Sequence, residues 1–363
     1  MRRTFIIILF ISIEINSFGQ SKGNKEKAYE IALQAIKIMD NGDFDKSIEL
    51  LKKSQKLDTK NYNYPYEIGY AYFLQKNYKK AIETLKEVIK YKKNNDQCFT
   101  LLGNIYDIDK QPEKAIEIYK QGLNKFPKSG RLYFELGNVQ EVLKEYDNAL
   151  ESWENGISVS PSYSSNYYTA SIYYCKYTME KIWGIIYGEL FINIERGSER
   201  TVEISKLLFD TYKSSVNIKS DTEASVSFSK TMQISLPKKG KEIKQPFSMP
   251  YEMTMALAAT SELSEKELGI ESFSNMRTTF INNWYENRRN IEYPNILFDW
   301  HKKLIEMDFF ESYNYWILMK GNEDEFEIWS AKNSEKFDLF IEWFSENPLL
   351  INEENNFHRL QYN

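Results

Sequence analysis

The sequence repeats one pattern four times at a constant interval between residues 28 and 163. Small side chains recur at the eighth and twentieth places of each repeat, and a ring-bearing side chain recurs at the seventeenth. A period of about 34 residues is typical of a solenoid, in which each repeat buries one face against the next. In order, these places hold Ala35, Gly69, Gly103 and Gly137; Ser47, Ala81, Ala115 and Ala149; and Phe44, Tyr78, Pro112 and Tyr146.

The small residues indicate where the two helices of one repeat approach each other most closely. A larger side chain at either place would force the helix axes apart and destabilise the repeat by overpacking. Pro127 and Pro161 stand at the thirty-second place, where a proline ends a helix without breaking one. The pattern therefore predicts paired helices joined by short turns.

This pattern resembles the tetratricopeptide repeat, a helix–turn–helix unit that recurs at the same period. The third and fourth repeats fit best, while the first has Ser47 for alanine and the second has Pro65 where the family prefers a large aromatic residue. The resemblance implies an all-α superhelix of four clear repeats: 28–61, 62–95, 96–129 and 130–163.

The resemblance weakens after residue 163. Residues 164–216 predict a divergent fifth repeat, with Trp183 at the small twentieth place, followed by a capping helix. The region 217–246 predicts an extended or β segment, because apolar residues alternate from Val226 to Leu236. A hairpin, a strand added to a partner and an arm over the solenoid are all compatible with it, and we expect the arm.

Helical spacing of apolar residues returns in residues 247–350, which predict a helical C-terminal domain of unrecognised family. Five of the seven tryptophans fall in this region, as expected for the core of a helical bundle. Residues 351–363 are mostly polar and predict a frayed tail.

The N-terminal segment 1–19 predicts a secretory signal peptide. Arg2 and Arg3 precede the short apolar run Phe5–Ile13, and the small residues Ser17 and Gly19 favour cleavage before Gln20. We therefore expect an exported protein, periplasmic or secreted, with no integral membrane span after signal removal.

Charge is distributed unevenly along the chain. The net charge is −5, and the 21 acidic and 10 basic residues from Phe247 onward give −11, which leaves +6 for residues 1–246. The two regions are either complementary docking surfaces or simply solvated. A mild overall charge gives no support for nucleic-acid binding.

The sequence shows no catalytic, cofactor or metal motif. The only histidines, His301 and His358, have no second metal ligand at a suitable spacing, so we expect surface or half-buried side chains. The two cysteines, Cys98 and Cys175, stand in different repeats, and we expect free thiols. These features favour a protein that is not an enzyme and holds no cofactor.

The resemblance also implies a binding groove, because the first helices of tetratricopeptide repeats line a concave surface. An aromatic row beside amide side chains suits an extended peptide. A clamp for a chain terminus is disfavoured, since only one basic residue is present. The candidate groove residues are Tyr29, Asn63, Tyr66, Tyr70, Phe73, Asn104, Asp107, Arg131, Phe134 and Asn138.

Three functions follow as hypotheses. The first is a non-enzymatic interaction module that binds a partner polypeptide in this groove in the bacterial cell envelope. The second is a structural scaffold whose groove is filled by its own C-terminal part. The third is an enzyme with an unrecognised C-terminal active site.

Overall fold

The computed structural model describes residues 19–220, 222–229, 246–263 and 267–362. The chain divides into two compact units, residues 1–115 and 116–363. Most of the predicted signal peptide, residues 1–18, lies outside the described residues.

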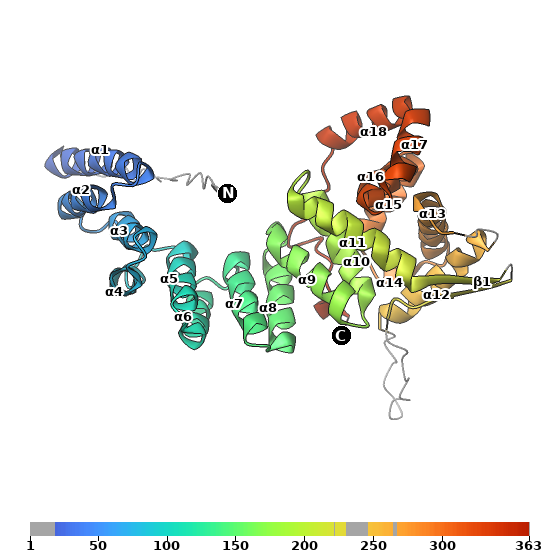
Figure 1. The fold of residues 1–363 in the computed structure, drawn as a ribbon, viewed down its shortest axis with the longest axis horizontal. Helices are drawn as coiled ribbons and strands as arrows, with labels where there is room; N and C mark the ends of the chain where they lie inside the picture. The colour runs from blue at the N-terminus through green and yellow to red at the C-terminus, as the bar shows by residue number, and fades with distance from the viewer. Residues whose placement is uncertain (1–18, 221, 230–245, 264–266, 363) are drawn as a thin grey trace. The chain divides into compact units, whose positions relative to one another are not determined.

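The predicted helix pairs are present, and the all-α class is confirmed. Within each unit, helices that follow one another in sequence pack side by side: α1 to α5 in the first unit and α7 to α11 in the second (Figure 1). The repeat helices are α1 (Gly19–Asp40), α2 (Phe44–Leu57), α3 (Asn63–Leu74), α4 (Tyr78–Val88), α5 (Asp96–Ile108), α6 (Pro112–Lys125), α7 (Gly130–Val142), α8 (Tyr146–Val159), α9 (Ser164–Tyr177) and α10 (Lys181–Ile194).

Small residues do mark the close helix crossings. A Cβ atom added to Gly69 would lie 2.7 Å from Leu85 Cγ, and one added to Gly137 would collide with the indole of Trp153. Ala35, at the equivalent place, is fully buried. The interpretation of the eighth place as a point of close packing is confirmed.

The turn inside each of the first four repeats has the same backbone shape. Gly42, Lys76, Lys110 and Lys144, which stand at one place of successive repeats, all have positive φ, of 87°, 60°, 63° and 63°. The next amide hydrogen-bonds back across the helix end, as from Asn77 N to Tyr72 O at 2.9 Å. This geometry is the Schellman ending of a helix, and lysine adopts it at three turns although glycine would carry less strain.

The fifth repeat departs from the pattern at its second helix. Trp183 is buried against Phe247 and Phe357, with ring centroids 5.1 and 5.6 Å away. The close approach moves to the next residue, Gly184, where an added Cβ would lie 2.8 Å from the backbone nitrogen of Cys175. The glycine pair Gly184 and Gly188, one helical turn apart, therefore replaces the usual small place.

The predicted capping helix is α11 (Glu199–Ser215), which packs on α9 and α10. It begins at a capping box formed by Ser198 and Thr201. An adjacent side of α11 faces C-terminal residues: Phe209 lies 5.4 Å from Phe273 between ring centroids, and Ser205 Oγ accepts a hydrogen bond from Lys320 N at 3.1 Å.

The segment after α11 forms a hairpin, and the expected arm is wrong for the described part. Strand β1 (Val216–Ser220) pairs antiparallel with β2 (Glu223–Val226), with Val216 opposite Val226. Of the predicted alternating run, only Val226 lies in a strand; Phe228 is buried, and Met232, Ile234 and Leu236 lie outside the described residues.

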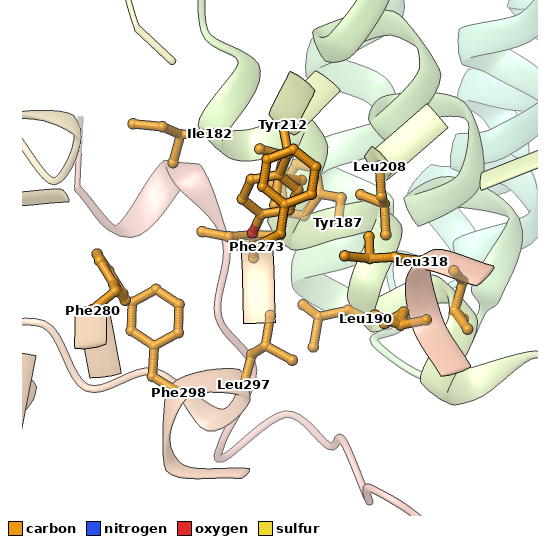
Figure 2. Packing of buried hydrophobic residues seen from close by; sticks show 14 of the residues in the cluster. Ile182, Tyr187, Leu190, Leu208, Tyr212, Phe273, Phe280, Leu297, Phe298 and Leu318 are labelled. Carbon is orange, nitrogen blue, oxygen red and sulfur yellow. The ribbon is translucent and has the colours of Figure 1, made fainter. Parts of the chain in front are cut away.

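The C-terminal part is helical, as expected. Figure 2 shows ring and aliphatic side chains from α10, α11, α13, α15 and α16 pointing toward one another. One hydrophobic core contains buried residues from Ala149 to Phe357, on both sides of the domain boundaries predicted at 216 and 246. Those domain boundaries stay a prediction. The remaining elements are α12 (Ser248–Ala259), η1 (Thr260–Glu262), α13 (Ile270–Glu286), α14 (Arg289–Glu292), α15 (Ile296–Glu306), α16 (Phe310–Leu318), η2 (Met319–Gly321), α17 (Glu323–Lys332), α18 (Ser334–Glu346) and η3 (Arg359–Gln361).

The predicted frayed tail is wrong. Phe357 is only 1% exposed, and Asn356 Nδ2 donates a hydrogen bond to Ile157 O at 2.8 Å. Polar composition was a poor guide to the structure of the tail, because the polar side chains of Asn356 and Arg359 form hydrogen bonds with residues of the repeats.

Gly137→Leu tests the close packing of paired helices. The larger side chain has no space beside Trp153, so the free energy of unfolding should fall by about 1–3 kcal/mol or more. Urea unfolding followed by circular dichroism measures this. Gly23→Leu is the matched control, because nothing lies within 4 Å of a Cβ there. Equal stability of the two variants would contradict the close crossing.

Candidate functional site

The predicted groove residues of the first unit lie on the first helices of their repeats. Tyr66, Tyr70 and Phe73 share one face of α3 and are half-buried. The rings of Tyr70 and Phe73 are 6.2 Å apart, and Tyr78 continues the row at 6.2 Å from Phe73. Burial raises the pKa of Tyr70, which keeps its hydroxyl protonated. The structure thus brings an aromatic row together on one repeat.

The other candidates of this unit lie on the first helices of all three repeats. Tyr29 is half-buried on α1, and Asn104 and Asp107 are half-buried on α5. Asn63 begins α3, where its backbone amide donates to Asn61 Oδ1 at 3.1 Å. Amide and carboxylate side chains are therefore available on the same set of helices as the aromatic row.

In the second unit, Arg131, Phe134 and Asn138 are half-buried on α7. The Phe134 ring lies 6.1 Å from that of Tyr163. Asn138 Oδ1 accepts a hydrogen bond from Trp153 Nε1 at 3.3 Å, so this amide also orients a core indole. Binding by all ten residues stays a prediction.

Sequence reasoning missed a site at which the chain's own tail docks on the fourth and fifth repeats. Its centre is Glu154, whose side chain is fully buried. Arg359 donates to both carboxylate oxygens, from Nε to Oε1 at 2.8 Å and from Nη2 to Oε2 at 2.5 Å. Tyr174 and Tyr187 also donate to Oε1, at 2.8 and 3.1 Å. The long separation of Glu154 and Arg359 along the chain hides this pair from any sequence pattern.

A second unforeseen feature is an ionic cluster in the C-terminal core. Glu189 of α10, Arg277 of α13 and His301 of α15 are each at most 3% exposed. The Glu189 carboxylate pairs with the Arg277 guanidinium and accepts from His301 Nε2 at 2.7 Å. Asn314 of α16 accepts a further hydrogen bond from Arg277. The prediction that both histidines are exposed or half-buried is wrong: His301 is 3% exposed and His358 is 9% exposed.

Burial and the neighbouring charges determine the protonation states of Glu189 and His301 in this cluster. Burial alone would raise the pKa of Glu189, but Arg277 and His301 more than offset it and lower that pKa to about 2. Burial lowers the pKa of His301, and Glu189 offsets this only in part because Arg277 already compensates its charge. At neutral pH the cluster therefore holds a carboxylate, a guanidinium and a neutral imidazole.

The space beside this cluster is small. A cavity of about 10 Å³ touches Glu189, Arg277 and His301, together with Tyr212 and Tyr251. That volume admits one water molecule and no organic substrate. The arrangement is suited to joining helices α10, α13 and α15 through an ion pair and hydrogen bonds.

The cysteines and the possible metal ligands give no sign of a reactive site in the described residues. Cys98 and Cys175 are buried free thiols, as predicted, and burial raises the pKa of Cys175 to about 11. In the part of the chain that the structure describes, no group of three or more His, Cys, Asp or Glu residues could hold a metal ion.

Comparisons with known proteins give three results. A family model described as anaphase-promoting complex, cyclosome, subunit 3 matches residues 40–121. No curated protein matches the chain. Solved structures match part of it at low similarity.

The structure named MamA is 24% identical, covers 44% of this chain and 93% of its own, and has a TM-score of 0.37. YrrB, titled a TPR protein with an unusual peptide-binding site, is 18% identical, covers 51% and 95%, and has a TM-score of 0.36. Pseudomonas aeruginosa pilF is 16% identical, covers 52% and 86%, and has a TM-score of 0.44.

The helix pairs and their left-handed turns at residues 42, 76, 110 and 144, together with the model match to residues 40–121, identify the kind of repeat. The repeats have the tetratricopeptide-repeat fold. Proteins built from this repeat generally act as interaction scaffolds, and the match to residues 40–121 suggests the same general role here. Among the described helices, none combines the length and the apolar character needed to cross a membrane.

His301→Gln tests the protonation of the ionic cluster. The unfolded chain binds a proton at histidine near the ordinary pKa of 6.5, whereas folded His301 stays neutral below it, so wild-type stability should fall as the pH drops from about 7 to about 5. The variant should lose less stability over this range, measured by urea unfolding at both pH values. A wild-type slope that the substitution leaves unchanged would contradict a neutral, buried His301.

Proposed function

We propose that this protein is a non-enzymatic interaction module that binds a partner polypeptide on the first helices of its repeats, in the bacterial cell envelope. The observation that carries the proposal is the half-buried aromatic row Tyr66, Tyr70 and Phe73 on α3. Rigid rings give contact area at a low cost in conformational entropy, and neighbouring amides suit the backbone of an extended peptide.

The alternative is a scaffold whose groove is filled by its own C-terminal part. The bonds from the described C-terminal residues to repeats four and five fall on residues such as Glu154, Ile157 and Tyr167. Arg131, Phe134 and Asn138 take no part in these bonds. This pattern favours docking of the C-terminal part outside the predicted groove positions.

The envelope location rests on the N-terminal sequence. Two arginines followed by a short apolar run and small residues at 17 and 19 are the features of an exported precursor. The location is part of the proposal, and the capture experiment below also tests it.

Replacing Tyr66 and Tyr70 together with alanine should abolish partner capture while the melting temperature changes little. Tagged full-length chains are purified from the envelope fraction, and bound proteins are compared by quantitative mass spectrometry. Tyr146→Ala is the matched control, because this tyrosine is 44% exposed on a second helix.

Two outcomes would contradict the proposal. If the double variant still captured the partner, the groove residues would not be needed for binding. A large fall in its melting temperature would show that the two tyrosine rings belong to the core. An intact chain that keeps residues 1–19 and stays in the cytoplasm would contradict the export.

A further inference from the structure

The first unit contains an open hollow away from the predicted groove residues. It has a volume of about 670 Å³ and lies between α2 and the end of α3 with the start of α4. Ile48 and Tyr72 form its apolar part, and charged side chains surround them. This volume is in the range of ligand-binding clefts in proteins.

The ionic character of the hollow favours an anionic ligand. Its carboxylates are already engaged: Asp45 accepts from Gln75 Nε2 at 2.8 Å, and Glu49 pairs with Lys53 at 2.7 Å. Lys52 and Lys80 line the hollow and form no ion pair within the described residues. The Lys80 ammonium lies 5.4 Å from the centre of the Tyr72 ring. A ligand carboxylate would supply the charge partner that these lysines lack.

The repeat register connects this hollow with the docked tail. Tyr72 and Tyr174 stand at the same place of the second and fifth repeats, and Lys52 and Glu154 at the same place of the first and fourth. In the second unit, Tyr174 and Glu154 lie at the docking site, where Glu154 accepts hydrogen bonds from Arg359, the first residue of η3 in the tail. The surface between one second helix and the next repeat thus binds a segment of the chain's own tail there, and the side chain at this place carries the charge opposite to that of the group it binds.

We propose that the hollow binds a peptide segment of a partner protein in which a carboxylate side chain lies near an apolar residue. The carboxylate pairs with Lys52 and Lys80, and the apolar side chain packs on Tyr72 and Ile48. This surface is separate from the groove on the first helices, so the chain has two peptide-binding surfaces, and the second does not depend on the first.

The test uses two labelled peptides with the sequence of residues 350–363, one native and one carrying Arg359→Glu. Fluorescence anisotropy measures their binding to the full-length protein, whose own tail occupies the Glu154 site. The hollow carries Lys52 at the place where the tail-docking site carries Glu154. The Arg359→Glu peptide should therefore bind about tenfold more tightly than the native peptide.

Lys52→Glu in the protein should reverse this preference. Lys79→Glu is the matched control: it makes the same charge change at an exposed residue beside Lys80 that does not line the hollow. Circular dichroism verifies that both variants fold, and the Tyr66 and Tyr70 double variant should bind the peptide as the wild type does.

Equal affinity for the two peptides, or no binding of either, would overturn the proposal. The same holds if Lys79→Glu and Lys52→Glu have equal effects, since long-range charge would then explain the binding. Loss of binding in the Tyr66 and Tyr70 double variant would place the peptide in the groove and overturn the second surface while leaving the groove proposal intact.

Discussion

The close crossing of paired helices is the constraint on which this structure depends. Gly69 and Gly137 leave no space for a Cβ atom, so the second helix of each of these repeats lies directly against the first. At this short distance, side chains at fixed places face the neighbouring repeat and others face outward. The aromatic row of α3 and the hollow beside α2 both follow from that regular placement.

The C-terminal part continues the same packing with different contacts. Phe209 and Ser205 of α11 meet Phe273 and Lys320, so helices distant in sequence cover the last helix of the solenoid. The buried pair of Glu189 and Arg277 links α10 to α13 within this core. Removing one partner of such a pair typically costs about 3–5 kcal/mol, because the other charge is left buried and unpaired. The cluster therefore favours one arrangement of these helices.

Local pattern predicted much of the fold, and long-range pairing accounts for most of what it missed. Small side chains at a constant interval predicted the crossings, and apolar spacing predicted the C-terminal helices. The bonds from Glu189 to Arg277 and from Glu154 to Arg359 join residues 88 and 205 positions apart, and such pairs have no local signature. In the fifth repeat, the pattern places the close helix contact at Trp183, whereas the structure places it at Gly184 and Gly188. The groove residues were placed from family resemblance, and their position on first helices does not by itself show binding.

The central claim is that the end of the solenoid and the C-terminal helices form one cooperative core, while the early repeats are available for binding. Hydrogen–deuterium exchange of the full-length protein, followed by mass spectrometry of peptides, tests it most directly. Amides of α10, α11, α13 and α16 should exchange together and last, after those of α1 and α2. Exchange of α10 and α11 as early as α1 and α2, with α13 and α16 still protected, would contradict the claim.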